Sequence, residues 1–478
     1  MKRLPAAILL VILLLAPAVR AEDATPAAPA PAHFEQLSGR EGYWRIGKDR
    51  AGAWWFVRPD GTRDFLNCVT TVQPHLAGRN PAGPHFTSRD WDGRSHDGPG
   101  LDRWAEAAVA RVSAYGFKGL GAWCDPVFHK YDVPMTRDLN LSTWVGGDAR
   151  RVFSPKWEQR VEDAVRRQVT PLRQNRSLVG YYLDNEIDWS DAAAGPAAYF
   201  NALPLRDPNR TEVLNVVRSV WPDLDDLNRD WGTRAGTWDE LAAWVELPPA
   251  PRAADAYARL YDAWLGHLAR RYFDVTTRLV RKHDPNHLVL GVRFRGYAPP
   301  QVVAASRGLT DAQSVNYYPN DAKLDRTLFQ SLHERSGGQP VIVSEYAFHS
   351  LDGRSGNRNT FGFPAQVADQ AARASGYRDM TTRLARLPYV IGADWFQWMD
   401  EPPSGRVRDG EDVNFGVVDI ADRPYETLVE AVRSTTPLLN GLHERSASEG
   451  YADVWRKEAS RDATVVGTDQ EELLEVGK

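Results

Sequence analysis

The sequence predicts an α/β protein built as a (β/α)8 barrel, the TIM-barrel architecture, with one inserted segment forming a wall of a cleft. Short apolar runs alternate with longer helical patterns, and we count eight strand-then-helix units in one stretch of chain, which indicates a parallel sheet. No Gly-x-Gly-x-x-Gly turn occurs, which favours a closed barrel over a doubly wound sheet. The 478 residues, 42% hydrophobic and 25% charged, suit a globular chain with a large core.

Turn and capping residues mark the elements of the first half. Pro59-Asp60-Gly61 precedes the first expected strand, and Gly116 ends the first expected helix. Ser154 and Pro155 have the pattern of an N-cap followed by a proline at the first helical position. The strands are expected at 64–72, 117–125, 134–141 and 178–186, with helices at 101–116 and 154–175.

The second half repeats the alternation after an extra segment. Residues 195–250 contain four tryptophans and lie outside the repeat, so we expect them to build one cleft wall. A long amphipathic helix follows and stops at Asp284-Pro285. The remaining strands are expected at 287–294, 311–319, 340–348 and 389–400, with helices at 253–285 and 364–387.

The two ends of the chain differ in composition from the middle. A basic start, an apolar run and Val19-Arg20-Ala21 predict a signal peptide over 1–21. Residues 22–40 are expected to be a Pro/Ala-rich linker, 41–444 the catalytic domain, and 445–478 a polar tail that lacks the composition of a folded segment. The expected location is therefore periplasmic or secreted, with no membrane association once the signal is cleaved.

Charge and cysteine usage exclude several function classes. The net charge of −5 gives no indication of nucleic acid as a partner. No metal-ligand spacing such as Cys-x-x-Cys occurs, so we expect neither a metal nor a cofactor. Cys68 and Cys124 are expected near the ends of neighbouring strands, as buried free thiols or, as the alternative, a disulfide.

Two glutamates end apolar strands and carry the functional hypothesis. Glu186 ends the fourth expected strand in "GYYLDNEIDW", and Glu345 ends the seventh in "VIVSEYAF". Functional groups of such barrels lie at the C-terminal ends of the strands. Two carboxylates in one cleft suit acid/base or glycosyl-transfer chemistry, in which one stays protonated and the other ionised.

Four stretches also resemble a known family. They are "LVGYYLDNEIDW" (178–189), "HLVLGVRF" (287–294), "SVNYYP" (314–319) and the segment 392–433. Together they resemble the clan A glycoside hydrolases, and within that clan families 42 and 50, the β-galactosidases and β-agarases, over about residues 40–440. The chain departs from family 50 after Glu345, where Tyr346-Ala347-Phe348-His349 replaces the usual Phe-His-Phe-Gly. The family's extra β-sandwich is also missing from residues 22–60.

The resemblance implies an enzyme that cleaves β-linked glycans by a retaining double displacement, with a polysaccharide or oligosaccharide as substrate. Together with the expected signal peptide, this makes a secreted β-glycosidase the leading hypothesis. Glu186 would be the general acid/base and Glu345 the nucleophile. We expect burial to raise the pKa of Glu186. Asn185 is expected to bind the sugar 2-hydroxyl, and a bulge after the fourth strand would let both residues reach it.

Other polar and aromatic residues at strand ends are expected to bind substrate or to support the glutamates. Period-two alternation places Asn316 and Tyr318 on one side of the sixth strand, where Tyr318 can donate to the nucleophile. Trp395 and Gln397 share a side on the eighth strand, with Trp395 as a floor for the sugar. Arg293 is expected to pair with a carboxylate, with the catalytic glutamates as the nearest candidates. Asp184 is expected to be ionised and paired, with Arg293 as its favoured partner, and Asp188 to be solvated or to cap the next segment.

Two alternatives stay open at this stage. One is the same chemistry on another β-glycan, such as a glucan or mannan. The other is a carbohydrate-binding barrel without activity, against which the pair Glu186 and Glu345 argues. A metal-dependent hydrolase on the same fold lacks ligands. Linkage, endo or exo action and oligomeric state do not follow from the sequence.

Overall fold

The structure is a computed structural model that describes residues 33–142, 151–189, 196–244, 246–247, 254–319, 324–362 and 365–448. The expected signal peptide, most of the linker and most of the tail lie outside the described residues. None of the described helices is both long enough and apolar enough to cross a membrane.

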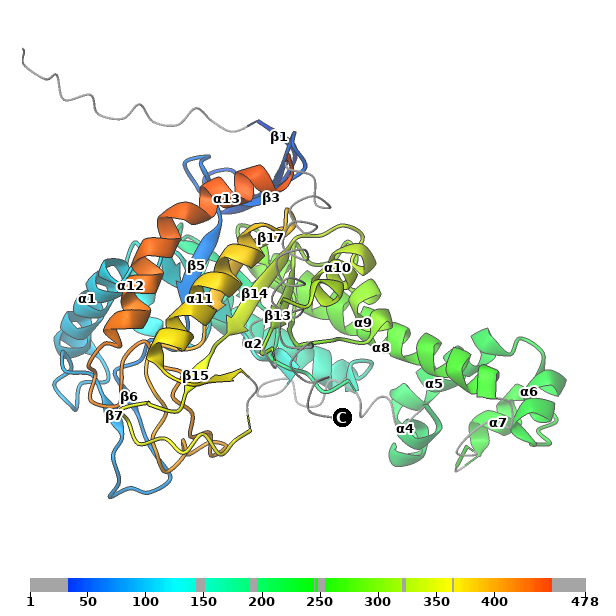
Figure 1. Cartoon of the computed structure of the whole chain (residues 1–478). Coiled ribbons are helices and arrows are strands. Elements are labelled where there is room, and N and C mark those ends of the chain that lie inside the picture. The colour runs from blue at the N-terminus through cyan, green and yellow to red at the C-terminus, as the bar shows by residue number, and fades with distance from the viewer. Residues whose placement is uncertain are drawn as a thin grey trace, which may run out of the picture. The chain divides into compact units, whose positions relative to one another are not determined.

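A curled parallel sheet with helices packed outside it forms the centre (Figure 1). Its nine strand segments are β5 (Leu66–Val69), β8 (Gly119–Leu120), β9 (Met135–Asp138), β10 (Leu178–Tyr182), β11 (Leu288–Val289), β12 (Arg293–Arg295), β13 (Gln313–Asn316), β14 (Val341–Tyr346) and β17 (Val390–Trp395). They pair in the order β11-β10-β9-β8-β5-β17-β14-β13-β12. Each segment falls inside an expected strand except β12, which ends at Arg295, one residue beyond the expected range 287–294, so the α/β class and the parallel sheet are confirmed.

The two ends of that order, β11 and β12, belong to one stretch of chain, residues 288–295. Gly291 between them has a φ of 83°, a left-handed conformation that glycine adopts readily. β11 pairs with β10, and β12 pairs with β13. The fifth expected strand is therefore interrupted in its middle.

Capping residues mark the N-terminal ends of two helices beside the sheet. In α2 (Pro155–Val169), Ser154 is the N-cap and Pro155 opens the helix, as the sequence predicts. The expected helix at 364–387 is shorter, because Asp369 caps α11 (Gln370–Ala385) through a hydrogen bond to the Ala372 N–H. The others around the sheet are α1 (Gly98–Ala114), α8 (Ala254–His283), α9 (Pro300–Ala305), α10 (Arg326–Arg335), α12 (Glu426–Thr435) and α13 (Leu439–Ser446).

A small antiparallel sheet precedes the parallel one and was not predicted. It consists of β1 (Phe34–Ser38), β2 (Arg45–Asp49), β3 (Trp54–Val57) and β4 (Arg63–Asp64). Trp44, Ile46 and Phe56 pack in one buried cluster with apolar side chains of the parallel sheet, among them Leu66 and Ile391. Burial of this aromatic surface joins the small sheet to the central one.

The described residues of the inserted segment form four helices: α4 (Pro196–Ala202), α5 (Pro208–Val220), α6 (Leu224–Trp231) and α7 (Trp238–Ala243). Trp221 and Trp231 are buried against each other, with ring centroids 5.7 Å apart. α4 and α5 pack against α8, and Figure 1 shows the four helices, in green, beyond one end of α8. These tryptophans therefore form the insert's own core.

Candidate active site

Glu186 and Asn185 follow β10 at a point where the chain leaves regular strand geometry. Glu186 has a φ of 49°, and its N–H donates to the Arg293 carbonyl at 2.9 Å. The Asn316 Nδ2 atom lies 3.0 Å from both Asn185 Oδ1 and Glu186 Oε1. The irregular backbone thus directs both side chains into one site, as the sequence analysis expects.

Glu345 lies on β14 and accepts hydrogen bonds on both carboxylate oxygens. Tyr318 donates its hydroxyl to Oε2 at 2.8 Å, and Trp123 donates its indole N–H to Oε1 at 3.1 Å. The Arg293 guanidinium also donates to Oε1. All three partners are donors, so Glu345 serves only as an acceptor, as an ionised carboxylate does.

Glu186 lies in a different electrostatic environment. Burial raises the pKa of this carboxyl above its ordinary value, and the nearby charge of Glu345 adds to the rise. The hydrogen bond from Asn316 and the positive charge of Arg293 act in the opposite direction without cancelling it. The direction agrees with the expectation for a residue that holds a proton near neutral pH.

Arg293 is fully buried, and its contacts join several parts of the site. Besides Glu345 it donates to Asn185 Oδ1 at 3.0 Å and lies 3.5 Å from Asp138 Oδ2. The expected pairing of Arg293 with a catalytic glutamate is confirmed, whereas the expected pairing of Asp184 with Arg293 is wrong. Asp184 instead accepts from the Ser142 N–H at 2.9 Å and from the Tyr272 hydroxyl.

The eighth strand also differs from expectation. Trp395 is fully buried, donates its indole N–H to the Phe415 carbonyl at 3.0 Å and packs on Tyr377 of α11, so its proposed place under the sugar is wrong. Gln397 is fully buried and does not line the cleft. The next aromatic residue, Phe396, lines the cleft and meets the Tyr318 ring edge-on at 6.2 Å.

A cleft of about 670 Å³ opens over these residues. Its lining includes Asn185, Glu186, Tyr318, Glu345 and Phe396, together with side chains from 71–77, 123–126 and 406–411. No described residue of the insert lines it, so the cleft wall expected from 195–250 is not found among the described residues. Two of the four tryptophans of the insert, Trp221 and Trp231, pack against each other.

Trp123, Asp138 and Phe396 also belong to this site and were not predicted from the sequence. Trp123 and Asp138 both lie within expected strands, and their position near the strand ends was the available signal. Cys68 and Cys124 are free thiols, the first of the two readings. Among the described residues, no group of three or more His, Cys, Asp or Glu is arranged to hold a metal ion.

Comparison with solved structures first shows which fold this is. No family model matches the chain. The fold is similar to that of an exo-β-agarase, with a TM-score of 0.72 and 22% identity over 86% of this chain and 66% of that one. PfGH50B gives a TM-score of 0.72 at 23% identity over 85% and 67%, and BpGH50 gives 0.63 at 18% over 87% and 86%. The chain therefore shares its fold with a solved exo-β-agarase, with PfGH50B and with BpGH50.

Two curated relatives are similar in sequence as well. β-Agarase B of Vibrio sp. (strain JT0107) is 29% identical over 353 residues, which are 69% of this chain and 36% of that protein. β-Agarase A of the same strain is 26% identical over 365 residues, 70% of this chain and 35% of that protein. The matching part of the chain thus spans about a third of the length of these relatives. The grouping in clan A and the link to family 42 stay predictions.

Proposed function

We propose that the protein is a β-glycoside hydrolase that cleaves a β-linked galactan of the agarose type. One observation carries the proposal: Glu186 and Glu345 line the same cleft in opposite electrostatic environments. Burial raises the pKa of Glu186, whereas Glu345 accepts from Arg293, Trp123 and Tyr318. Such a pair provides one proton donor and one anion for glycosyl transfer.

The reaction is a retaining double displacement. Glu345 attacks the anomeric carbon and forms a covalent glycosyl intermediate, while Glu186 protonates the departing oxygen and then deprotonates the incoming water. The three donors on Glu345 fix its carboxylate for attack. An inverting reaction would instead need a water held between the two carboxyl groups.

The remaining site residues position the reacting groups. Asn185 binds the sugar 2-hydroxyl, and Asn316 orients both Asn185 and Glu186 through its carboxamide. Tyr318 and Arg293 orient Glu345, and Phe396 forms an apolar face of the sugar site. Trp395 and Gln397 have no part in it.

Agarose as the substrate is proposed because the two curated relatives are β-agarases and a solved exo-β-agarase has a similar fold. Another β-glycan, a glucan or mannan, is the alternative. The usual Phe-His-Phe-Gly after the nucleophile is replaced here by Tyr346-Ala347-Phe348-His349, so the histidine stands two positions later. Secretion through the signal peptide at 1–21 fits a substrate too large to enter a cell. N-terminal sequencing of the exported protein tests the cleavage site.

We also propose that the parallel sheet closes into an eight-stranded barrel, with residues 288–295 as the fifth strand, and that 41–444 is the catalytic domain. Backbone hydrogen bonds on both sides of this stretch support the closure. Leu290 N–H donates to the Tyr181 carbonyl at 2.8 Å, and Gly296 N–H donates to the Asn316 carbonyl at 3.0 Å. Closure explains why Arg293 can reach both Glu345 and Asn185.

The test is hydrolysis of a panel of aryl β-glycosides and of agarose, β-glucan and β-mannan by the wild type and by Glu345→Gln. We expect the wild type to release sugar from the β-galactoside and from agarose, and the variant to release none. Hydrolysis of the glucan or the mannan alone would show that agarose is not the substrate and would leave the glycoside hydrolase standing. Binding of polysaccharide without hydrolysis of any of them would contradict the proposed enzyme.

A further inference from the structure

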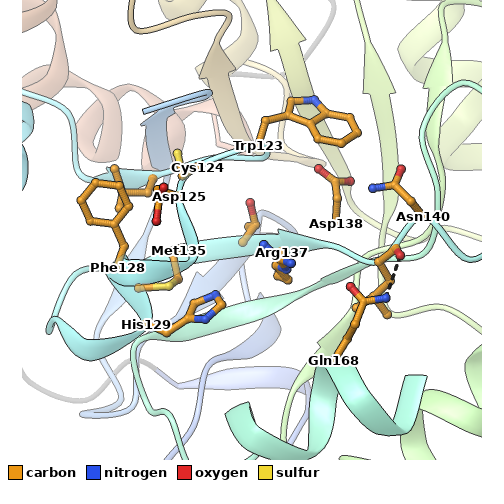
Figure 2. Close-up of a pocket in the computed structure, with 13 residues that line it drawn as sticks. Trp123, Cys124, Asp125, Phe128, His129, Met135, Arg137, Asp138, Asn140 and Gln168 are labelled. Atoms are coloured by element: carbon orange, nitrogen blue, oxygen red, sulfur yellow. Dashed lines mark hydrogen bonds between the residues drawn. The ribbon is translucent and has the colours of Figure 1, made fainter. Parts of the chain in front are cut away.

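A second cavity, of about 220 Å³, lies beside the catalytic cleft. Trp123, Cys124, Asp125 and Arg137 line both spaces, so they form a shared wall. Figure 2 shows Trp123 and Asp138 on one side of the segment 135–140, and His129 and Gln168 on the other. We call this cavity the side pocket.

The side pocket exists because two neighbouring strands separate. β8 and β9 pair at a single position, Leu120 with Met135, whereas β9 continues to pair with β10 as far as Asp138. Beyond Leu120, the segment that carries Trp123 therefore leaves β9. The space between them faces the same end of the sheet as Glu186 and Glu345.

Several polar groups that line the side pocket have no partner in the described part of the chain. The Thr136 hydroxyl and the Oδ1 atom of Asp138 are buried there without a hydrogen bond. Arg137, half-buried at the shared wall, forms no ion pair with any described residue. Buried polar groups in folded proteins are normally hydrogen-bonded, so the Thr136 hydroxyl and Asp138 Oδ1 indicate a polar occupant, for which Arg137 offers a further donor.

The lining also indicates the chemistry of that occupant. Arg137 donates, Asp125 and Asp138 accept, and Thr136 can do both, while the Trp123 ring adds an apolar face. This mixture suits the hydroxyl groups and the apolar ring face of a sugar. A sulfate or carboxylate suits it less, because Asp125 and Asp138 are acidic.

The histidine of the side pocket adds no positive charge that would favour an anion. Burial, with the neighbouring charge of Arg137, lowers the pKa of His129 to about 4, so its ring is neutral at neutral pH. A volume of 220 Å³ equals about seven waters at roughly 30 Å³ each, room for one small ring and not for a chain.

We propose that the side pocket binds one neutral sugar unit, carried as a branch on the glycan chain that occupies the cleft. This proposal rests on the proposed function of the cleft, whose wall it shares. Trp123 connects the two sites, since its ring faces the side pocket and its indole N–H donates to Glu345. A bound branch therefore contacts the side chain that helps to orient the nucleophile.

The test compares two substrates and two matched variants. Thr136→Val removes the unpaired hydroxyl and keeps the shape and the β-branching of the side chain. Thr277→Val is the control, because the Thr277 hydroxyl is also buried without a partner among the described residues but lies on α8, away from both spaces. The substrates are a linear β-galactan oligosaccharide and the same oligosaccharide with single galactose branches.

For Thr136→Val we expect the ratio of kcat/KM on the branched substrate to kcat/KM on the linear one to fall about tenfold, the effect of one lost hydrogen bond. Thr277→Val should leave the ratio at its wild-type value. A ratio unchanged in Thr136→Val, with both oligosaccharides hydrolysed, would overturn the side pocket and leave the proposed function standing.

If neither oligosaccharide is hydrolysed, the proposed function fails, and a binding measurement decides on the side pocket. Saturation-transfer NMR with methyl β-D-galactopyranoside uses the wild-type protein and both threonine variants. Binding that is weakened in Thr136→Val and kept in Thr277→Val supports the site. Equal signals from all three proteins, or none from the wild type, overturn it.

Discussion

Replacing Tyr318 with phenylalanine tests the environment of the proposed nucleophile. The change deletes one hydroxyl, which donates to Glu345 Oε2 at 2.8 Å, and leaves the donors on Oε1, Trp123 and Arg293, in place. A hydrogen bond to a charged group contributes about 1.5–3 kcal/mol. If that contribution is made in the transition state, kcat/KM falls by roughly ten- to 150-fold at about 1.4 kcal/mol per factor of ten.

The assay is release of an aryl alcohol from an aryl β-galactoside, with thermal unfolding followed by circular dichroism. Tyr346→Phe is the matched control, because the Tyr346 hydroxyl pairs with Thr381 at the α11 side of β14 and away from the cleft. We expect the control to unfold at a lower temperature and to keep its activity. A Tyr318→Phe enzyme as active as the wild type would refute the reasoning.

Three further predictions follow from the same contacts. Glu345→Ala should lose turnover, and added azide should restore part of it and give an α-glycosyl azide; the β-azide would assign Glu345 as the acid/base. Glu186→Gln should no longer hydrolyse glycosides with poor leaving groups and should still react with activated aryl glycosides. Because the raised pKa of Glu186 makes the wild type lose its acid as pH rises through that pKa, this variant should also lack the alkaline fall in activity on activated substrates, whereas an unchanged pH profile would point to another acid. Asp184→Asn should lower the free energy of unfolding in urea by about 1–3 kcal/mol, since the buried carboxylate accepts from Ser142 and Tyr272; loss of acid catalysis in a stable variant would contradict this.

The parts of the site that the sequence predicts are those that depend only on strand position. Glu186, Glu345, Asn316 and Tyr318 all follow or end apolar runs, and parallel strands bring their ends together. The carboxylate partner of Arg293 was predictable for another reason, because a buried arginine on a barrel strand requires a negative charge beside it. An apolar run followed by a polar residue therefore predicts where a strand ends and which residue lies at the site.

The wrong predictions concern residues for which the alternation of side chains does not tell which face of the strand points into the cleft. Period two relates Trp395 to Gln397, but it does not say which side of β17 faces the cleft, and Trp395 packs outward on Tyr377. After Tyr182 the chain departs from regular alternation, and so Asp184 reaches Tyr272 on α8 instead of Arg293. In the insert, the tryptophan count could not separate a sugar-binding wall from a core formed by Trp221 and Trp231.

The stereochemistry of the first-formed product tests the central claim most directly. NMR follows the anomeric proton of the reducing sugar during the first minutes of hydrolysis, before mutarotation mixes the two anomers. A double displacement through Glu345 predicts that the β-anomer appears first and the α-anomer later. Appearance of the α-anomer first would mean inversion by a directly attacking water and would contradict a covalent role for Glu345.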